Sequence, residues 1–314
     1  MKPSDHQITR RGAVGALAIL GASFPQLRAL GEAEMANPAH QAKAREPAPK
    51  GDGGAPWLTL PPTPKLPTAT RAGHAIVNGT EIFFGQYGGE GVPLLLLHGG
   101  LANSNYWGHQ IERLAGDFAV TVMDTRGHGR SPVTSNNFSY AVFAEDVVGL
   151  MDELRIPSAG IVGWSDGAVT GLQLAITHPE RVTKLFAFGA STSRDGTKRG
   201  GSRSPVFRSY FERCKSEYLA LSPHPERWAQ LLDGLRAMWR SQQNFTPERL
   251  AQVKVPTVIC AGEYDEIVKQ EHAIEISKEI NGARLKILAN VSHFAMLQNP
   301  VQFNEEIIRF IKSD

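Results

Sequence analysis

Cysteine is scarce in this chain. Cys214 and Cys260 are the only two among 314 residues, too few to build a disulfide-stabilised fold. Cys260 ends the apolar run "PTVIC", which is typical of a small buried residue. No group of cysteines and histidines has zinc-ligand spacing, so the sequence predicts no metal site.

An excess of charge of one sign is also missing. There are 33 Lys and Arg against 31 Asp and Glu, a formal net charge of +2. No basic motif with interleaved aromatic residues occurs either, so nucleic acid is not expected as a partner. A hydrophobic content of 41% fits a soluble globular protein. The length allows one large α/β domain or two small ones.

The N-terminal apolar run is too short to cross a bilayer comfortably. It covers about residues 12–22 and follows a polar, basic start. Thr9-Arg10-Arg11 stands just before it, which resembles a bacterial twin-arginine export signal. We expect residues 1–36 to be an export signal, and the protein to be periplasmic or secreted without a stable membrane span after signal removal. An uncleaved anchor, or a cytosolic protein with a chance apolar start, are the alternatives.

Proline is dense over residues 37–70, and no apolar period accompanies it. Such a segment buries too little surface to offset its ordering entropy, so we interpret it as a flexible or extended linker. The folded domain then runs from about residue 71 to 314.

Short apolar runs and amphipathic patterns alternate along this domain. The segment "AIVNGTEIFFGQYG" predicts a hairpin that turns at Asn78-Gly79. Continuous apolar runs such as "VPLLLLHGG" are typical of strands buried on both faces. The fold class is therefore α/β, with a mostly parallel sheet and helices on both faces. Further strands are expected at 118–124, 159–165, 181–191, 256–265 and 284–290, and helices at 104–117 (with Ser104 as N-cap), 139–154, 166–178, 269–280 and the C-terminus.

Residues 193–250 interrupt this alternation. They lack buried-strand runs and carry helical patterns with large apolar side chains, so we predict a small helical cap over the strand ends. The core then consists of residues 71–192 and 251–314. The basic run "RDGTKRGGSR" (194–203) leaves two interpretations open: a contact for an anionic substrate or lipid headgroup, or a solvated mobile loop. The large apolar side chains of the cap are Phe207, Phe211, Trp228, Met238 and Trp239.

The segment "GWSDG" places Ser165 between an apolar run and a helical pattern. Gly-x-Ser-x-Gly between a strand and a helix is the nucleophile elbow, in which a sharp turn exposes the serine hydroxyl. Side chains at Gly163 or Gly167 would collide with neighbouring backbone. A tight turn with an incidental serine is the alternative.

An activated serine needs a base, and His293 in "NVSHFAM" follows the last strand. It therefore lies at a carboxyl end of the sheet, where open parallel sheets bind ligands. We assign His293 as the base. His98 is expected to hydrogen-bond within its loop, and His128 and His178 to be structural.

The imidazole needs a carboxylate, and Asp265 ends the strand "PTVICAGEYD". The order Ser165, Asp265, His293 is one that triads adopt. Glu263 and Glu266 flank Asp265 and are possible substitutes.

An oxyanion needs backbone donors. We expect one from Asp166, which follows the serine, and one from the "HGGLANS" loop, from Gly100 first or Leu101 second. Leu101, Trp107 and Trp164 are the expected substrate contacts.

Five segments together resemble the α/β-hydrolase fold family: "LLLLHGG", "VMDTRGHGRS", "GWSDG", "GEYDEIV" and "SHF". The resemblance covers nearly all of residues 73–314, and "GWSDG" is similar to valacyclovir-hydrolase-like and related small esterase and lactonase branches. It implies a Ser-His-Asp hydrolase with a helical cap and no cofactor.

We therefore predict hydrolysis of a small-molecule carboxylic ester or lactone through an acyl-enzyme. Carbon–carbon bond hydrolysis or perhydrolysis on the same three residues is one alternative, and a non-catalytic binding protein is another. The sequence does not indicate an oligomeric state.

Overall fold

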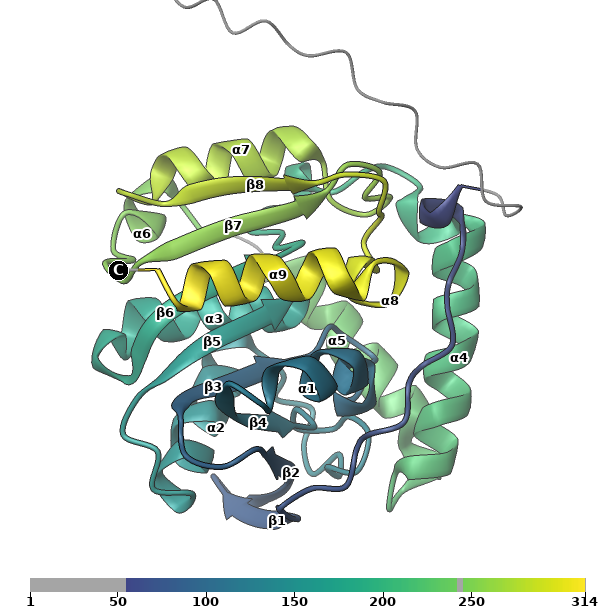
Figure 1. Cartoon of the computed structure of the whole chain (residues 1–314). Helices are drawn as coiled ribbons and strands as arrows, with labels where there is room; N and C mark the ends of the chain where they lie inside the picture. The colour runs from purple at the N-terminus through teal and green to yellow at the C-terminus, as the bar shows by residue number, and fades with distance from the viewer. Residues whose placement is uncertain (1–54, 242–244, 314) are drawn as a thin grey trace, which may run out of the picture. The chain divides into compact units, whose positions relative to one another are not determined.

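The computed structural model describes residues 55–241 and 245–313 (Figure 1). Within these ranges, no helix combines the length and the apolar character that crossing a membrane requires. The predicted export signal over residues 1–36 lies outside the described residues, and so do residues 37–54 of the predicted linker. The export signal and the periplasmic or secreted location stay predictions.

The sheet begins with the predicted hairpin. Strands β1 (Arg71–Val77) and β2 (Thr80–Tyr87) pair antiparallel. The φ angles are +46° at Asn78 and +74° at Gly79, so both turn residues are left-handed. A two-residue turn of this kind matches the twist of its strands, and Asn-Gly adopts it readily.

Eight strands form one sheet in the order β1-β2-β4-β3-β5-β6-β7-β8. Strand β2 pairs antiparallel with β4, and every pair from β4 to β8 is parallel. All residues of β5 and β7 are buried, as expected for strands covered on both faces. The predicted α/β class with a mostly parallel sheet is confirmed. The remaining strands are β3 (Val92–Leu97), β4 (Phe118–Met123), β5 (Ala159–Trp164), β6 (Val182–Phe188), β7 (Thr257–Gly262) and β8 (Arg284–Leu288).

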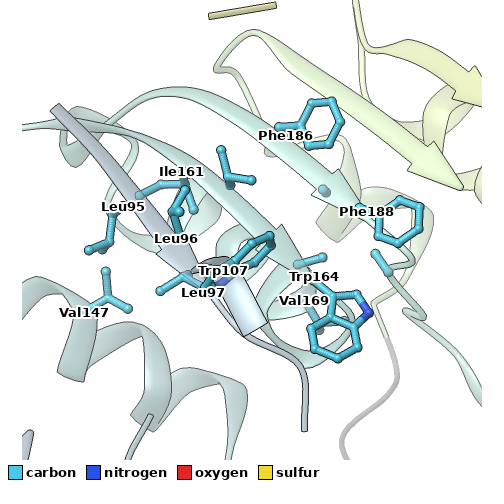
Figure 2. Packing of buried hydrophobic residues seen from close by; sticks show 14 of the residues in the cluster. Leu95, Leu96, Leu97, Trp107, Val147, Ile161, Trp164, Val169, Phe186 and Phe188 are labelled. Atoms are coloured by element: carbon cyan, nitrogen blue, oxygen red, sulfur yellow. The ribbon is translucent and has the colours of Figure 1, made fainter. Parts of the chain in front are cut away.

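Helices cover both faces of the sheet (Figure 1). Helices α1 (Gly108–Leu114) and α9 (Pro300–Ile311) pack on one face. The short helix α8 (Ala295–Gln298) directly precedes α9 in the chain. The opposite face carries α2 (Tyr140–Glu153), α3 (Asp166–Thr177), α6 (Pro247–Leu250) and α7 (Gln270–Glu279). Between the faces, neighbouring strands contribute large buried side chains, including Leu96, Ile161 and Phe186 (Figure 2).

The predicted N-cap at Ser104 is wrong. Asn103 has an extended backbone and its side-chain oxygen accepts the N–H of Asn105, so it caps a 3₁₀ turn, η2 (Ser104–Trp107). Ser104 lies inside this turn and donates its own N–H to Asp124. The α-helix begins only at Gly108.

Two long helices, α4 (Pro205–Leu221) and α5 (Trp228–Ser241), occupy the predicted cap segment between β6 and β7. Both lie at the carboxyl ends of the parallel strands (Figure 1). Short 3₁₀ turns at Arg194–Gly196, Gly201–Arg203 and Pro225–Arg227 precede them.

The linker predicted over residues 37–70 extends too far toward the domain, because residues 55–70 pack on the domain beside α4 (Figure 1). Arg213 donates to the carbonyl of Leu60 at 2.9 Å, and Gln298 to that of Thr59 at 2.8 Å. Trp57, in a 3₁₀ turn (Pro56–Leu58), stacks on Tyr264. The packed chain therefore starts before residue 71. Side chains of the domain bind the backbone carbonyls of this segment, and such contacts leave no apolar period in its sequence.

Candidate active site

Ser165 lies between β5 and α3 in a strained conformation. Its φ is +54° and its ψ is −119°, outside the regions that non-glycine residues favour. A Cβ at Gly163 would lie 2.4 Å from the carbonyl oxygen of Gly167, and one at Gly167 would lie 2.1 Å from that of Leu97. Both positions therefore require glycine, as the elbow interpretation predicts.

Asp265 and His293 form a buried pair. Asp265 follows β7 and His293 follows β8, and their Oδ2 and Nδ1 atoms are 2.8 Å apart. Their side chains are only 2% and 3% exposed. The other carboxylate oxygen, Oδ1, accepts the backbone N–H groups of Ile267 and Val268, each at 2.8 Å. These two bonds fix the carboxylate so that Oδ2 faces the imidazole.

The pKa of His293 is raised above its ordinary value. Burial by itself lowers this pKa, but the charge of Asp265 and its hydrogen bond outweigh burial, with further contributions from Glu266 and Asp166. The protonated imidazole therefore persists to a higher pH than in water.

This shift sets the pH dependence that we predict. If His293 must be neutral to take a proton from serine, kcat/KM falls as pH drops through the raised pKa. The midpoint of the acid limb is expected above the ordinary value of 6.5. Rates measured from pH 5 to 9 on a neutral ester test this, since a neutral ester has no titrating group of its own. A midpoint below that ordinary value contradicts the assignment of His293 as base.

A cavity of about 710 Å³ opens above Ser165, and we call it the site cavity. It is large enough for a small organic molecule. Asp265 lies behind His293 rather than on the wall. The predicted residues that line the site cavity are Gly100, Leu101, Trp164, Ser165, Asp166 and His293.

Trp107 is the exception among the predicted substrate contacts. It does not line the site cavity, and its side chain is fully buried next to Phe303 of α9, at 6.2 Å between ring centroids. Figure 2 shows it within the buried cluster. It ends the 3₁₀ turn η2, from which its side chain packs toward α9. Its expected role is therefore corrected to core packing.

The side chain of Asp166 also takes part in the site, through hydrogen bonds to its carboxylate. Its Oδ1 accepts from the Tyr140 hydroxyl at 2.9 Å, and its Oδ2 from the indole N–H of Trp239 at 2.8 Å. Burial raises the pKa of this carboxyl. No local sequence pattern predicts these contacts, because Tyr140 and Trp239 come from α2 and α5, far from Asp166 along the chain.

Tyr210 of α4 connects the cap to the loop after β3. Its hydroxyl donates to the carbonyl of Gly100 at 2.5 Å. That carbonyl belongs to the same peptide as the N–H of Leu101, which has a left-handed φ of +68°. Within the described residues, no backbone acceptor contacts the N–H of Leu101. Tyr210 thus restrains the peptide that the oxyanion prediction depends on.

We predict that Tyr210→Phe lowers kcat by roughly three- to tenfold, the effect of one neutral hydrogen bond, with little change in KM. Tyr218→Phe is the matched control. Tyr218 is a buried tyrosine of the same helix, and its hydroxyl donates to the carbonyl of His224 instead. Equal loss of kcat in both variants would mean that the effect is one of helix stability.

The other histidines and acids have different partners. His98 bonds through Nδ1 to the carbonyl of Gly99 and accepts the N–H of Thr125 at Nε2, the loop role predicted for it. Burial lowers the pKa of His128 to about 3. Glu263 accepts the N–H of Asn290, and Glu266 the backbone N–H of His293. In residues 55–241 and 245–313, no group of three or more His, Cys, Asp or Glu is arranged to hold a metal ion.

The family profile described as alpha/beta hydrolase fold matches residues 92–216. The human serine hydrolase BPHL is 29% identical over 259 residues, which cover 78% of this chain and 87% of that protein. The 2-hydroxy-6-oxo-6-phenylhexa-2,4-dienoate hydrolase of Comamonas testosteroni is 25% identical over 261 residues, with coverage of 71% and 89%. The solved structure of Est816, described as an N-acyl homoserine lactone degrading enzyme, has a TM-score of 0.66 and 26% identity, and the match covers 76% of this chain and 100% of that one.

Proposed function

Since this chain belongs to the alpha/beta hydrolase family and is a hydrolase, we propose that it cleaves a small carboxylic ester or lactone through an acyl-enzyme. The observation that carries the proposal is the buried pair of His293 and Asp265, whose imidazole lines the same cavity as the strained Ser165. A serine hydroxyl reacts only when a base takes its proton, and this arrangement supplies an oriented base.

In the proposed reaction, His293 accepts the proton of Ser165 as the serine oxygen attacks the substrate carbonyl. The hydrogen bond from Nδ1–H to Asp265 leaves Nε2 unprotonated for this purpose and stabilises the imidazolium that forms. Collapse of the tetrahedral intermediate expels the alcohol, to which His293 returns the proton. Water, activated by the same imidazole, then hydrolyses the acyl-enzyme.

The oxyanion is proposed to be bound by backbone N–H groups. Asp166 is the first residue of α3, so its N–H has no partner within the helix and lies at the positive end of the helix dipole. The second donor comes from the loop at Gly100 and Leu101, which also lines the site cavity. Restraint of this loop by Tyr210 supports the assignment, because preorganised donors cost no reorganisation during the reaction.

The cap supports a small substrate. Phe207, Phe211 and Trp239 line the site cavity together with Leu232, so its roof is largely apolar. A roofed cavity of this size suits esters or lactones with short to medium groups rather than polymers or long-chain lipids.

Carbon–carbon bond hydrolysis is the second candidate. It is favoured by the likeness to the Comamonas hydrolase, which is named for a dienoate substrate. The same three residues serve both reactions, so product analysis with a vinylogous diketone substrate separates them.

A fluorophosphonate probe and a panel of substrates test the proposal. The probe is expected to label the full chain at one serine. Among p-nitrophenyl esters of increasing acyl length and several lactones, kcat/KM is expected to peak at short to medium length. No labelling and no turnover of any ester, lactone or diketone would support a binding protein with this fold instead.

A further inference from the structure

Basic side chains surround the outer part of the site cavity. Four of them line it, and we call this set the cationic rim: Arg194, Lys198, Arg208 and Arg236. They are exposed and come from three separate segments, the loop after β6, helix α4 and helix α5. None is needed for the proposed acyl transfer.

The cationic rim is poorly neutralised by the protein itself. Within the described residues, no carboxylate lies within 4.0 Å of Arg194, Lys198 or Arg208, and Arg236 has one distant partner, Asp233 at 3.7 Å. Glu212 and the buried Asp166 are the two carboxylates among the described residues that line the site cavity, and in the same ranges no ion pair joins Glu212 to the rim. The outer cavity therefore carries an excess of positive charge.

Part of the cationic rim is also held in place. The N–H of Lys198 donates to the carbonyl of Ile267 at 2.8 Å, and its Nζ to the carbonyl of Asp265 at 2.6 Å. Thr197 forms a β-bridge with Val268. Lys198 is thus fixed to the wall beside the His293–Asp265 pair, which a solvated mobile loop does not explain.

Charge is therefore distributed unevenly along the site cavity. The buried carboxyl of Asp166 lies at the floor next to Ser165, and the cations lie further out on the cap side. An anion at the floor would meet a carboxyl, whereas an anion held away from the scissile bond would meet several unpaired cations.

We propose that the preferred substrate is an ester or lactone whose acyl portion ends in a carboxylate, which the cationic rim binds while Ser165 attacks the carbonyl at the other end. This inference rests on the proposed function and adds the chemical class of the substrate. The carboxylate is bound equally in the ground state and the transition state, so its effect falls on KM more than on kcat.

Two esters of matched size test the proposal with the full chain. One is the p-nitrophenyl monoester of adipic acid, with a free carboxylate, and the other is the p-nitrophenyl ester of adipamic acid, in which a neutral amide replaces it. After subtraction of spontaneous hydrolysis, we expect kcat/KM to favour the carboxylate by about tenfold at low salt, through a lower KM. The preference is expected to shrink when ionic strength rises from about 0.02 M to about 0.5 M, because exposed charges are screened.

Arg208→Gln and Arg236→Gln, singly and together, are expected to reduce the ratio of the two kcat/KM values toward one. Arg240→Gln is the matched control: Arg240 is exposed on the last turn of the same helix as Arg236 and is not among the described residues that line the site cavity. It is expected to leave the ratio where it is in the parent. The variant residues are exposed, so folding should be retained, and thermal unfolding of each variant checks this.

A ratio of one or below in the parent protein at low salt overturns the proposal, and so does a ratio that the double variant leaves unchanged. Both results require turnover of the neutral ester, so they leave the proposed function intact. Absence of turnover with both esters, together with absence of fluorophosphonate labelling, would instead overturn the proposed function on which the inference rests.

Discussion

Ser165→Ala is expected to lower kcat for ester hydrolysis by about a millionfold, the usual cost of losing a triad serine. The physical reason is that the alanine methyl group cannot form an acyl-enzyme, while the imidazole loses the group whose proton it would accept. The strained turn is retained, because alanine keeps the same Cβ at a φ of +54° and removes only the hydroxyl oxygen. Steady-state hydrolysis of p-nitrophenyl acetate and fluorophosphonate labelling measure the effect.

Ser191→Ala is the matched control for this experiment. Ser191 also lines the site cavity, at the carboxyl end of a neighbouring strand, but its hydroxyl donates to the carbonyl of Ser193. It is expected to keep kcat within about tenfold of the parent, since surface or loop hydroxyls of this kind contribute one neutral hydrogen bond. Labelling that persists in Ser165→Ala but disappears in Ser191→Ala would mean that Ser191, and not Ser165, is the nucleophile.

Local sequence patterns were enough to predict most of the fold. The continuous apolar runs identified the buried strands, and Asn78-Gly79 identified the hairpin, because both signals depend only on neighbours along the chain. The carboxyl ends of parallel strands meet at one edge of a sheet, so the places of Ser165, Asp265 and His293 followed from strand order.

Contacts between distant segments were beyond the sequence. The partners of Asp166 come from α2 and α5, and Tyr210 reaches Gly100 across more than a hundred positions of the chain. The wrong prediction for Trp107 has the same cause. Its position beside the "HGGLANS" loop predicted a side chain in the site cavity, but the direction of that side chain is set by the turn η2 and by packing against Phe303.

The choice of Asp265 over its acidic neighbours leads to the second large prediction. Asp265→Asn is expected to lower kcat by about ten thousandfold, because the variant holds the imidazole in the wrong tautomer. The N–H groups of Ile267 and Val268 both donate to Oδ1, so the oxygen of an asparagine stays at that position and its NH₂ group turns toward His293. Nδ1 must then accept this hydrogen bond, which leaves the proton on Nε2, where the serine proton has to go.

A pH profile separates this effect from simple loss of structure. Asp265 raises the pKa of His293, so the residual activity of the variant is expected to have an acid limb at lower pH than the parent. Glu266→Gln is the matched control, because glutamine keeps an oxygen that accepts the backbone N–H of His293. It is expected to retain kcat within about tenfold, the scale of one hydrogen bond. A larger loss in Glu266→Gln than in Asp265→Asn would transfer the role of orienting acid to Glu266, and with it the explanation of how His293 is held for catalysis.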